Sequence, residues 1–407
     1  MLHFPKMNFF LRLIFTRNRG LVTKIKFRYI CVLLIIVFLL NSFGVFTHLF
    51  ELPFEDCFTY PYEGNILTFI DALKNGEKPS INPINEYNFS FIYANEKHCL
   101  DNDYNILHVV FIIKSAIENF DRRTAIRATW GSKKRFFDVP TKIVFLLGVH
   151  MNAAVQSQID NEVIKYEDIV QSNFIDSYYN NTIKTMLAFK WAKLYCSNSK
   201  FYMFVDDDIY VSVKNVLEFI RNPMSCIDES QNFNEFRPYK RKIKSNIISS
   251  PLNWQKFNRT KAGDNFMEKT QYIIDYELPN DMRLYAGYVF NSRPHRHKTS
   301  KWYVPLQEYP YNKWPLYVSA GAYVLSKEAL VDIYFASFYI KHFRFDDIYL
   351  GIIAKKVHLK PFHCHKFHFY KKDYTTYNYK HVITSHGYSD PKELIQVWNE
   401  QKLLGNA

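Results

Sequence analysis

The sequence predicts an α/β fold, and three stretches of the chain indicate it. Ile106–Lys114 (ILHVVFIIK) and Lys142–Gly148 (KIVFLLG) are continuous apolar runs of strand length, as expected for strands covered on both faces. Apolar residues within Asn180–Cys196 recur at helical spacing, and the strand-like run KFYMFV follows them. This alternation of strands and helices favours a parallel sheet with right-handed crossovers.

The N-terminal part of the chain is basic and is followed by a long apolar segment. No acidic residue precedes Glu51, and Tyr29–Phe50 contains no charged residue. As one helix this segment would be about 33 Å long, against about 30 Å for the hydrocarbon core of a bilayer. We therefore expect a cytoplasmic tail at 1–28 and a transmembrane signal-anchor at 29–50, with the remaining chain across the membrane. A cleaved signal peptide is the alternative.

The part of the chain beyond the anchor divides into a stem and a globular domain. Residues 51–104 are rich in proline and asparagine and show little periodicity, which is typical of a stem with some local structure. The α/β pattern starts at residue 105, and residues 223–280 form a more polar stretch that we interpret as an insertion. The net charge of +13 suits several anionic partners, but a location across the membrane argues against nucleic acid.

Two further features agree with an oxidising, glycosylating compartment. Three N-x-S/T sequons begin at Asn88, Asn180 and Asn258, although such triplets also occur by chance. Five cysteines follow the anchor, so up to two disulfides can form with one thiol left over. The sequence does not show which cysteines pair.

Three consecutive carboxylates, Asp206, Asp207 and Asp208, follow the run KFYMFV. Ligands of open α/β sheets bind at the carboxyl ends of the strands, which is where these residues are expected. Adjacent carboxylates repel one another, and a divalent cation such as Mg²⁺ or Mn²⁺ would neutralise them. The alternative is a solvated turn with an Asx cap.

Six ordered motifs give the sequence a resemblance to a known family. They are RRTAIRATWG (122–131), FLLG (145–148), DIVQSNFIDSYYNNTIKT (168–185), VDDDIYV (205–211), KWPLYVSAGAYVLS (313–326) and FDDIYLG (345–351). In order and approximate spacing they resemble glycosyltransferase family 31, the inverting β-1,3-glycosyltransferases of the Golgi. The resemblance covers nearly all of the part beyond the stem, and we place the glycosyltransferase domain at 105–400.

This resemblance implies a GT-A type, Rossmann-like fold, a UDP-sugar donor and a Mn²⁺ ion. Asp208 would bind the metal directly together with His386, while Asp206 and Asp207 would contact the ribose or metal-bound water. Asp347 corresponds to the catalytic base of the family. The preceding acid of the family, commonly glutamate, is the shorter Asp346 here, which puts its role in doubt. Without the family, His386 would be read as a surface residue, and the two aspartates as acids at a helix N-terminus.

The remaining candidates have ordinary structural explanations beside the functional ones. Arg123 and Arg127 share a helical face and could reach the diphosphate, and Lys184 is a weaker candidate because surface helices commonly carry lysine. Gly321 would permit close approach of the sugar, or only a bend of a strand. The histidines at 363, 365 and 368 alternate with phenylalanines and fit a half-buried strand better than a zinc site.

We therefore expect a Golgi type II membrane protein that forms a β-1,3 linkage. The resemblance favours transfer of GlcNAc from UDP-GlcNAc to a mannose- or galactose-type acceptor of a glycolipid, although a glycoprotein acceptor is not excluded. Transfer of galactose from UDP-galactose is the alternative within the same enzyme class. A non-catalytic luminal glycan-binding protein is the alternative from another class, although Asp208, Asp347 and His386 are all present.

Overall fold

The computed structural model describes residues 27–100, 106–132, 139–226 and 281–407. The chain divides into two compact units, which are described separately below. The first unit comprises Met1–Tyr60 and Asn291–Pro315, and the second comprises Pro61–Phe290 and Leu316–Ala407. Most of the predicted tail, most of the predicted insertion at 223–280 and the sequon at Asn258 lie outside the described residues.

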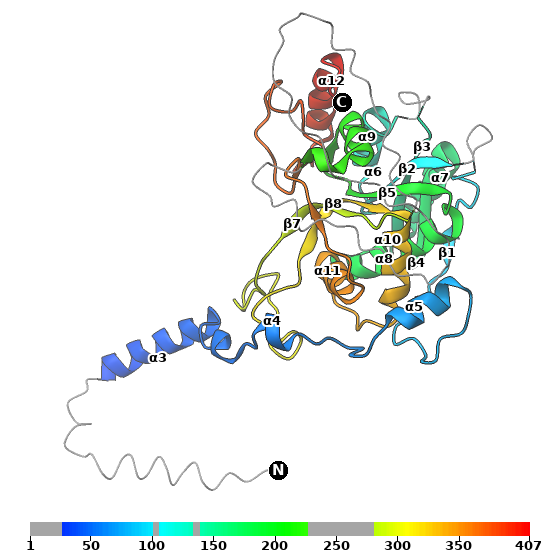
Figure 1. The fold of residues 1–407 in the computed structure, drawn as a ribbon. Helices are drawn as coiled ribbons and strands as arrows, with labels where there is room; N and C mark the ends of the chain where they lie inside the picture. The colour runs from blue at the N-terminus through cyan, green and yellow to red at the C-terminus, as the bar shows by residue number, and fades with distance from the viewer. Residues whose placement is uncertain (1–26, 101–105, 133–138, 227–280) are drawn as a thin grey trace, which may run out of the picture. The chain divides into compact units, whose positions relative to one another are not determined.

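The second unit is built on a large mixed sheet (Figure 1), so the predicted α/β class is confirmed. Its strand order is β1-β4-β3-β2-β5-β8-β7-β9. The bounds are Phe91–Tyr93 for β1, Leu107–Lys114 for β2, Thr141–Val149 for β3, Ile169–Ile175 for β4, Ser199–Asp206 for β5, Tyr285–Phe290 for β7, Tyr317–Ser326 for β8 and Phe362–His363 for β9.

The directions of the strands agree only in part with the parallel sheet that was predicted. The four central strands β4, β3, β2 and β5 are parallel, as the apolar runs indicated. Strand β8 is antiparallel to both β5 and β7, and β1 is antiparallel to β4. The sheet is therefore mixed. Strand β8 pairs with β5 but does not belong to the alternation of strands and helices that runs from β2 to β5.

Helices cover both faces of this sheet (Figure 1). Their bounds are Phe120–Ala128 for α6, Ala153–Tyr166 for α7, Asn181–Tyr195 for α8, Val213–Arg221 for α9, Lys327–Ser337 for α10, Asp346–Lys356 for α11 and Pro391–Leu403 for α12. Val109, Phe111 and Ile113 of β2 pack into one core with residues of α6, α9 and α12. Alternate residues of a strand point to opposite faces of its sheet. Val110 and Ile112 of β2 therefore point to the other face, where α8 lies, and they are as fully buried as the first three residues.

A small second sheet lies beside the carboxyl end of β5. It consists of β10 (Phe367–His368), β11 (Thr384–His386) and β6 (Ile209–Val211), in that order. The histidine-rich stretch at 363–368 thus forms two short strands, as the alternation with phenylalanine indicated. Cys364 between these strands is bonded to Cys226, which ends the short 3-10 helix η3 (Pro223–Cys226).

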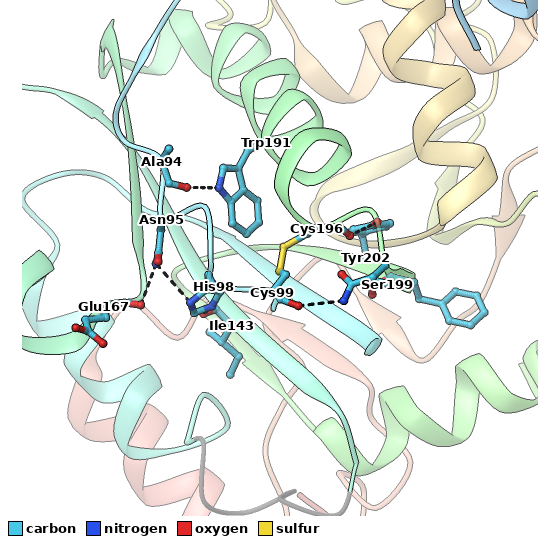
Figure 2. Close-up of a disulfide and its surroundings, with 12 residues drawn as sticks. Ala94, Asn95, His98, Cys99, Ile143, Glu167, Trp191, Cys196, Ser199 and Tyr202 are labelled. Carbon is cyan, nitrogen blue, oxygen red and sulfur yellow. Dashed lines mark hydrogen bonds between the residues drawn. A yellow bond between two sulfur atoms is a disulfide. The ribbon is translucent and has the colours of Figure 1, made fainter. Parts of the chain in front are cut away.

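Residues 61–100, part of the predicted stem, contribute elements to the second unit. They include helix α5 (Leu67–Lys74) and edge strand β1. The end of this segment is fastened by the disulfide Cys99–Cys196 (Figure 2). Beside that bond Trp191 Nε1 donates a hydrogen bond to the carbonyl oxygen of Ala94 at 2.6 Å. The structure thus contains two disulfides, the largest number that the sequence allowed beyond residue 50, and Cys57 is the remaining thiol of that part.

The first unit contains helix α3 (Phe27–Ser42), 3-10 helix η1 (Thr47–Phe50) and the short helix α4 (Phe54–Cys57). The single helix predicted over Tyr29–Phe50 does not form. Gly44 follows α3 with a φ of 77°, and the N–H of Val45 donates to the carbonyl of Leu40, which are features of a helix C-terminus. Among the described residues, no helix combines the length and the apolarity required to cross a membrane.

A buried arginine organises the rest of the first unit. The side chain of Arg296 is fully buried, and its guanidinium donates to Glu51 Oε1 at 2.7 Å. It also donates to the carbonyl oxygens of Val304, Tyr309 and Tyr311. A buried charge is tolerated when it is paired and hydrogen-bonded in this way.

Candidate active site

The three consecutive aspartates lie where the sequence predicted, at the carboxyl end of a buried strand. Strand β5 ends at Asp206, the next two residues form a turn, and β6 begins at Ile209. The neighbouring strand β2 ends level with β5, so that Lys114 lies opposite Asp206 in the register. Polar groups from two parallel strands therefore meet at one edge of the sheet.

Asp208 lies beside His386, as the resemblance implied for a shared metal site. Strand β11 is antiparallel to β6 and places His386 opposite Ile209. The N–H of Tyr388 donates to the carbonyl oxygen of Asp208 at 2.8 Å and fixes this end of the pairing. The result is a separation of 3.5 Å between His386 Nε2 and Asp208 Oδ2, with both side chains open to solvent in part.

This pair fits the type of cation that the family implies. Carboxylate oxygens suit Mn²⁺, and imidazole nitrogens bind other divalent metals of the first transition row. Gly321 of β8 adjoins them, because a Cβ atom built there would lie 3.7 Å from His386 Cδ2 and 3.9 Å from Asp206 Oδ2. In the described part of the chain, no three His, Cys, Asp or Glu residues converge as a metal cluster, and this includes the histidines at 363–368.

Asp207 points inward rather than toward solvent. It is buried, and its carboxylate accepts hydrogen bonds from Ser115 Oγ at 2.7 Å and Asn119 Nδ2 at 2.9 Å. Arg122 Nη1 donates to the other oxygen at 2.9 Å. Asp207 therefore holds the segment that follows β2 against the end of β5. Asp206 and Asp208 are the partly exposed carboxylates of this rim of the sheet, at the carboxyl end of β5.

Asp346, whose role the shortened side chain put in doubt, is buried and fully engaged. Its Oδ2 accepts hydrogen bonds from Lys114 Nζ at 3.0 Å and from Thr185 Oγ1 at 2.9 Å. Lys114 Nζ also lies 3.2 Å from Asp206 Oδ1. Burial lowers the pKa of Lys114, but the two carboxylates more than offset this and raise it above its ordinary value. Lys114 was not among the predicted site residues, and its only sequence signal is a cation ending an apolar strand.

Asp347, the predicted base, is half-buried in the first turn of α11. Its Oδ1 accepts a hydrogen bond from the N–H of Ile348 at 2.8 Å. Burial, together with the negative charge of Asp346, raises the pKa of Asp347 to about 7. The same neighbour is held in its anionic form, because Lys114 and Thr185 lower the pKa of Asp346 against the effect of burial. A carboxylate with such a pKa is suited to accept a proton near neutral pH.

The basic candidates from the sequence lie in buried ion pairs. Arg123 has no exposed side-chain surface and donates to Glu162 at 2.7 Å, to Ser115 Oγ and to the carbonyls of Ala116 and Ile117. Arg127 pairs with Glu162 and Asp168. Arg123 therefore positions the segment after β2, and Arg127 holds α6 to Glu162 of α7 and to Asp168. The guanidinium groups of both arginines are directed at protein acceptors.

Lys184 is likewise engaged within the protein. Its Nζ donates to the carbonyl oxygen of Ser115 at 2.6 Å and to both carboxylate oxygens of Asp176, at 2.9 and 2.8 Å. Burial lowers the pKa of Lys184, and the charge of Asp176 opposes that effect. Arg123 and Lys184 thus both donate to the turn at Ser115, next to Asp207, whereas Arg127 contacts Glu162 and Asp168.

The two described sequons differ in their surroundings. Asn88 is exposed, and its amide donates a hydrogen bond to Glu86 Oε2. Asn180 precedes α8 and donates to the carbonyl of Ile175. The hydroxyl of its sequon, on Thr182, is fully buried and donates to the carbonyl of Phe343.

Comparisons with known proteins agree with the family suggested by the six motifs. A family model described as galactosyltransferase matches residues 121–273 and 265–365. Beta-1,3-galactosyltransferase brn (brainiac) of Drosophila melanogaster is 36% identical over 380 residues, which cover 91% of this chain and 94% of that protein. Beta-1,3-galactosyltransferase 1 of Mus musculus is 28% identical over 318 residues, or 78% of this chain and 80% of the relative.

Among solved structures, the galactosyltransferase LgtC in complex with donor and acceptor sugar analogues aligns with a TM-score of 0.32 and 9% sequence identity. That alignment covers 73% of this chain and 100% of LgtC. The sequence relatives and the family model confirm the resemblance inferred from the motifs. The chain belongs to the galactosyltransferase family, glycosyltransferase family 31, and is a hexosyltransferase.

Proposed function

We propose that the chain is an inverting β-1,3-glycosyltransferase with a GT-A type fold that uses a UDP-sugar donor. One observation carries the proposal. Two groups of side chains lie at the same edge of the sheet: the Asp208–His386 pair and the acid pair Asp346–Asp347. Lys114 connects the two groups, because it contacts both Asp206 and Asp346. A leaving-group site and a base are the two parts that inverting transfer requires.

In this proposal Asp347 removes the proton from the acceptor hydroxyl as the hydroxyl oxygen attacks the donor sugar. Its partial exposure leaves the carboxylate accessible, and its raised pKa matches neutral conditions. The hydrogen bond from Ile348 and the position in the first turn of α11 fix the carboxylate against the backbone. Inversion follows when the attacking oxygen and the departing diphosphate lie on opposite faces of the sugar.

Asp208 and His386 would hold Mn²⁺, which when bound would stabilise negative charge on the diphosphate leaving group. Asp206 is the second partly exposed carboxylate of the rim, and a contact with the donor ribose or metal-bound water is its proposed role. Gly321 leaves the surface beside His386 uncovered, so that a sugar can approach the strand there. Asp207 would support these contacts from within the protein rather than touch the donor.

UDP-GlcNAc is the donor that the motif resemblance favours, with a mannose- or galactose-type acceptor on a glycolipid. UDP-galactose is the second candidate, and it is supported by the printed names of the relatives, which are β-1,3-galactosyltransferases. A direct test is to incubate the detergent-solubilised full-length chain with Mn²⁺, each UDP-sugar, and mannosyl or galactosyl acceptors. Analysis of the product linkage identifies the donor and acceptor, and absence of any transfer would favour the non-catalytic glycan-binding alternative.

We place the protein in the Golgi membrane as a single-pass type II protein. The basic leader before an apolar segment, the sequons and the two disulfides support a luminal location for residues 51–407. Protease treatment of sealed microsomes tests this topology. Protection of the chain beyond residue 50 agrees with the proposal, and digestion without detergent would contradict it.

A further inference from the structure

Lys114 connects three elements of the second unit at the rim of the sheet. Its side chain is only 5% exposed, and it extends from the last residue of β2. The ammonium group lies 3.2 Å from Asp206 Oδ1 of β5 and 3.0 Å from Asp346 Oδ2 of α11. It also donates to the carbonyl oxygen of Ala320 in β8 at 3.2 Å. One cation thus joins the aspartate motif on the proposed donor side to the acid pair on the acceptor side.

These contacts determine how the first turn of α11 is held. No side chain caps the N-terminus of α11, since Phe345 occupies the capping position. The buried carboxylate of Asp346 supplies the attachment instead, through Lys114 and through Thr185 of α8. Asp347 is the next residue in the same turn, so the attachment of Asp346 also fixes the backbone that carries Asp347.

We propose that Lys114 is a positioning residue for the acceptor base, which it serves by anchoring Asp346 and balancing the charge beside Asp347. The inference rests on the proposed role of Asp347 in proton removal. Lys114 itself does not react. Its charge compensates the buried carboxylate of Asp346 and lies beside the partly exposed carboxylate of Asp206.

The charge balance around Asp347 gives this role a measurable consequence. Asp346 raises the pKa of Asp347, and Lys114 lowers it. Tyr285 and Tyr323 also face this carboxylate, but burial raises the pKa of each phenol far above 10, so both remain neutral. Lys114 and Asp346 are thus the charged groups that set the protonation of Asp347, with opposite signs.

The test measures kcat against pH at saturating donor and acceptor for full-length wild type, Lys114→Met, Asp346→Asn and the double variant. The acid limb is the part of the profile where kcat falls with decreasing pH. Loss of Lys114 moves this limb to higher pH, and loss of Asp346 moves it to lower pH, each by about one unit. The double variant removes both opposing charges and lies between the single variants. Lys74→Met is the matched control, because Lys74 pairs with Asp332 on α10 away from the rim. The Lys74→Met variant should have a lower thermal midpoint and an unchanged acid limb in its pH profile.

Asp347→Asn separates the inference from the proposed function. If that variant retains normal turnover, Asp347 is not the base and the proposed mechanism fails. If Asp347→Asn is inactive while the acid limb stays in place in Lys114→Met or, should that variant not fold, in Asp346→Asn, the role of Lys114 is overturned and the base assignment stands. Asp346→Asn leaves Lys114 paired with Asp206, so this arm gives a result even if Lys114→Met does not fold.

Discussion

His386 Nε2 lies 3.5 Å from Asp208 Oδ2, although the two residues are far apart in the sequence. The contact depends on the antiparallel pairing of β11 with β6, which sets His386 opposite Ile209. Because that pairing belongs to the fold itself, the two donors lie together before any substrate binds. In the proposed function these two side chains would be protein ligands of different chemical type for Mn²⁺.

The first prediction concerns these two ligands. Asp208→Asn and His386→Ala should each weaken Mn²⁺-dependent binding of the UDP-sugar, because each removes one of two protein donors. The measurement is a calorimetric titration of donor at several Mn²⁺ concentrations, with the exposed Glu218→Gln on α9 as a control that changes charge away from the rim. Unchanged metal dependence in both site variants would return the aspartates to a solvated turn.

The second prediction concerns pH. The pKa of Asp347 is raised to about 7, and a base must be deprotonated to act. Activity should therefore be present above pH 7 and decline as the pH falls through 7, by about tenfold per unit once the acid dominates. A pH profile of kcat in wild-type protein provides the measurement. A rate that stays constant down to pH 5 would be incompatible with this pKa for the base.

The third prediction concerns the buried arginine network. Arg123→Met leaves Glu162 with Arg127 alone and removes the donors to the turn after β2. Breaking a buried ion pair should lower the free energy of unfolding by about 3–5 kcal/mol. Lys371→Ala removes an exposed ion pair with Glu393 and should lower the free energy of unfolding by at most about 1 kcal/mol. Denaturant unfolding of both variants tests the difference, and similar small losses would argue against a structural role for Arg123.

The fourth prediction concerns glycosylation. Asn88 is exposed and accessible, whereas the Thr182 hydroxyl in the Asn180 sequon is buried and bonded to Phe343. We expect Asn88 to carry a glycan in a secretory host. Electrophoretic mobility before and after glycosidase treatment, in wild type and Asn88→Gln, measures it. Identical glycosidase-sensitive shifts in the two proteins would show that Asn88 is not modified.

Local patterns predicted much of the second unit. The apolar runs at 106–114 and 142–148 correspond to β2 and β3, and the helix predicted over Asn180–Cys196 spans Asn181–Tyr195. The antiparallel direction of β8 was missed, because strand direction depends on a partner that is distant in the sequence. The apolar segment 29–50 was predicted as one helix on composition alone, whereas the left-handed conformation at Gly44 follows its end at Ser42.

The candidate site was predictable in position but not in the orientation of its side chains. The aspartates were expected at the end of a strand, and Asp206–Asp208 lie there. Adjacency in sequence could not reveal that Asp207 faces Ser115 and Asn119 within the protein. The role of Lys114 was equally hidden, since its partners come from β5, β8 and α11.

The central claim is that Asp347 is the base. Asp347→Asn preserves the size of the side chain but cannot accept the proton at neutral pH, so kcat should fall by about two orders of magnitude or more. The affinity for the UDP-sugar should stay within about twofold of wild type, because the carboxylate acts on the acceptor. Measuring kcat, donor affinity and thermal midpoint on one Asp347→Asn sample is the most direct test. Near-normal kcat with a lowered thermal midpoint would contradict the account and leave Asp347 as a structural residue at the start of α11.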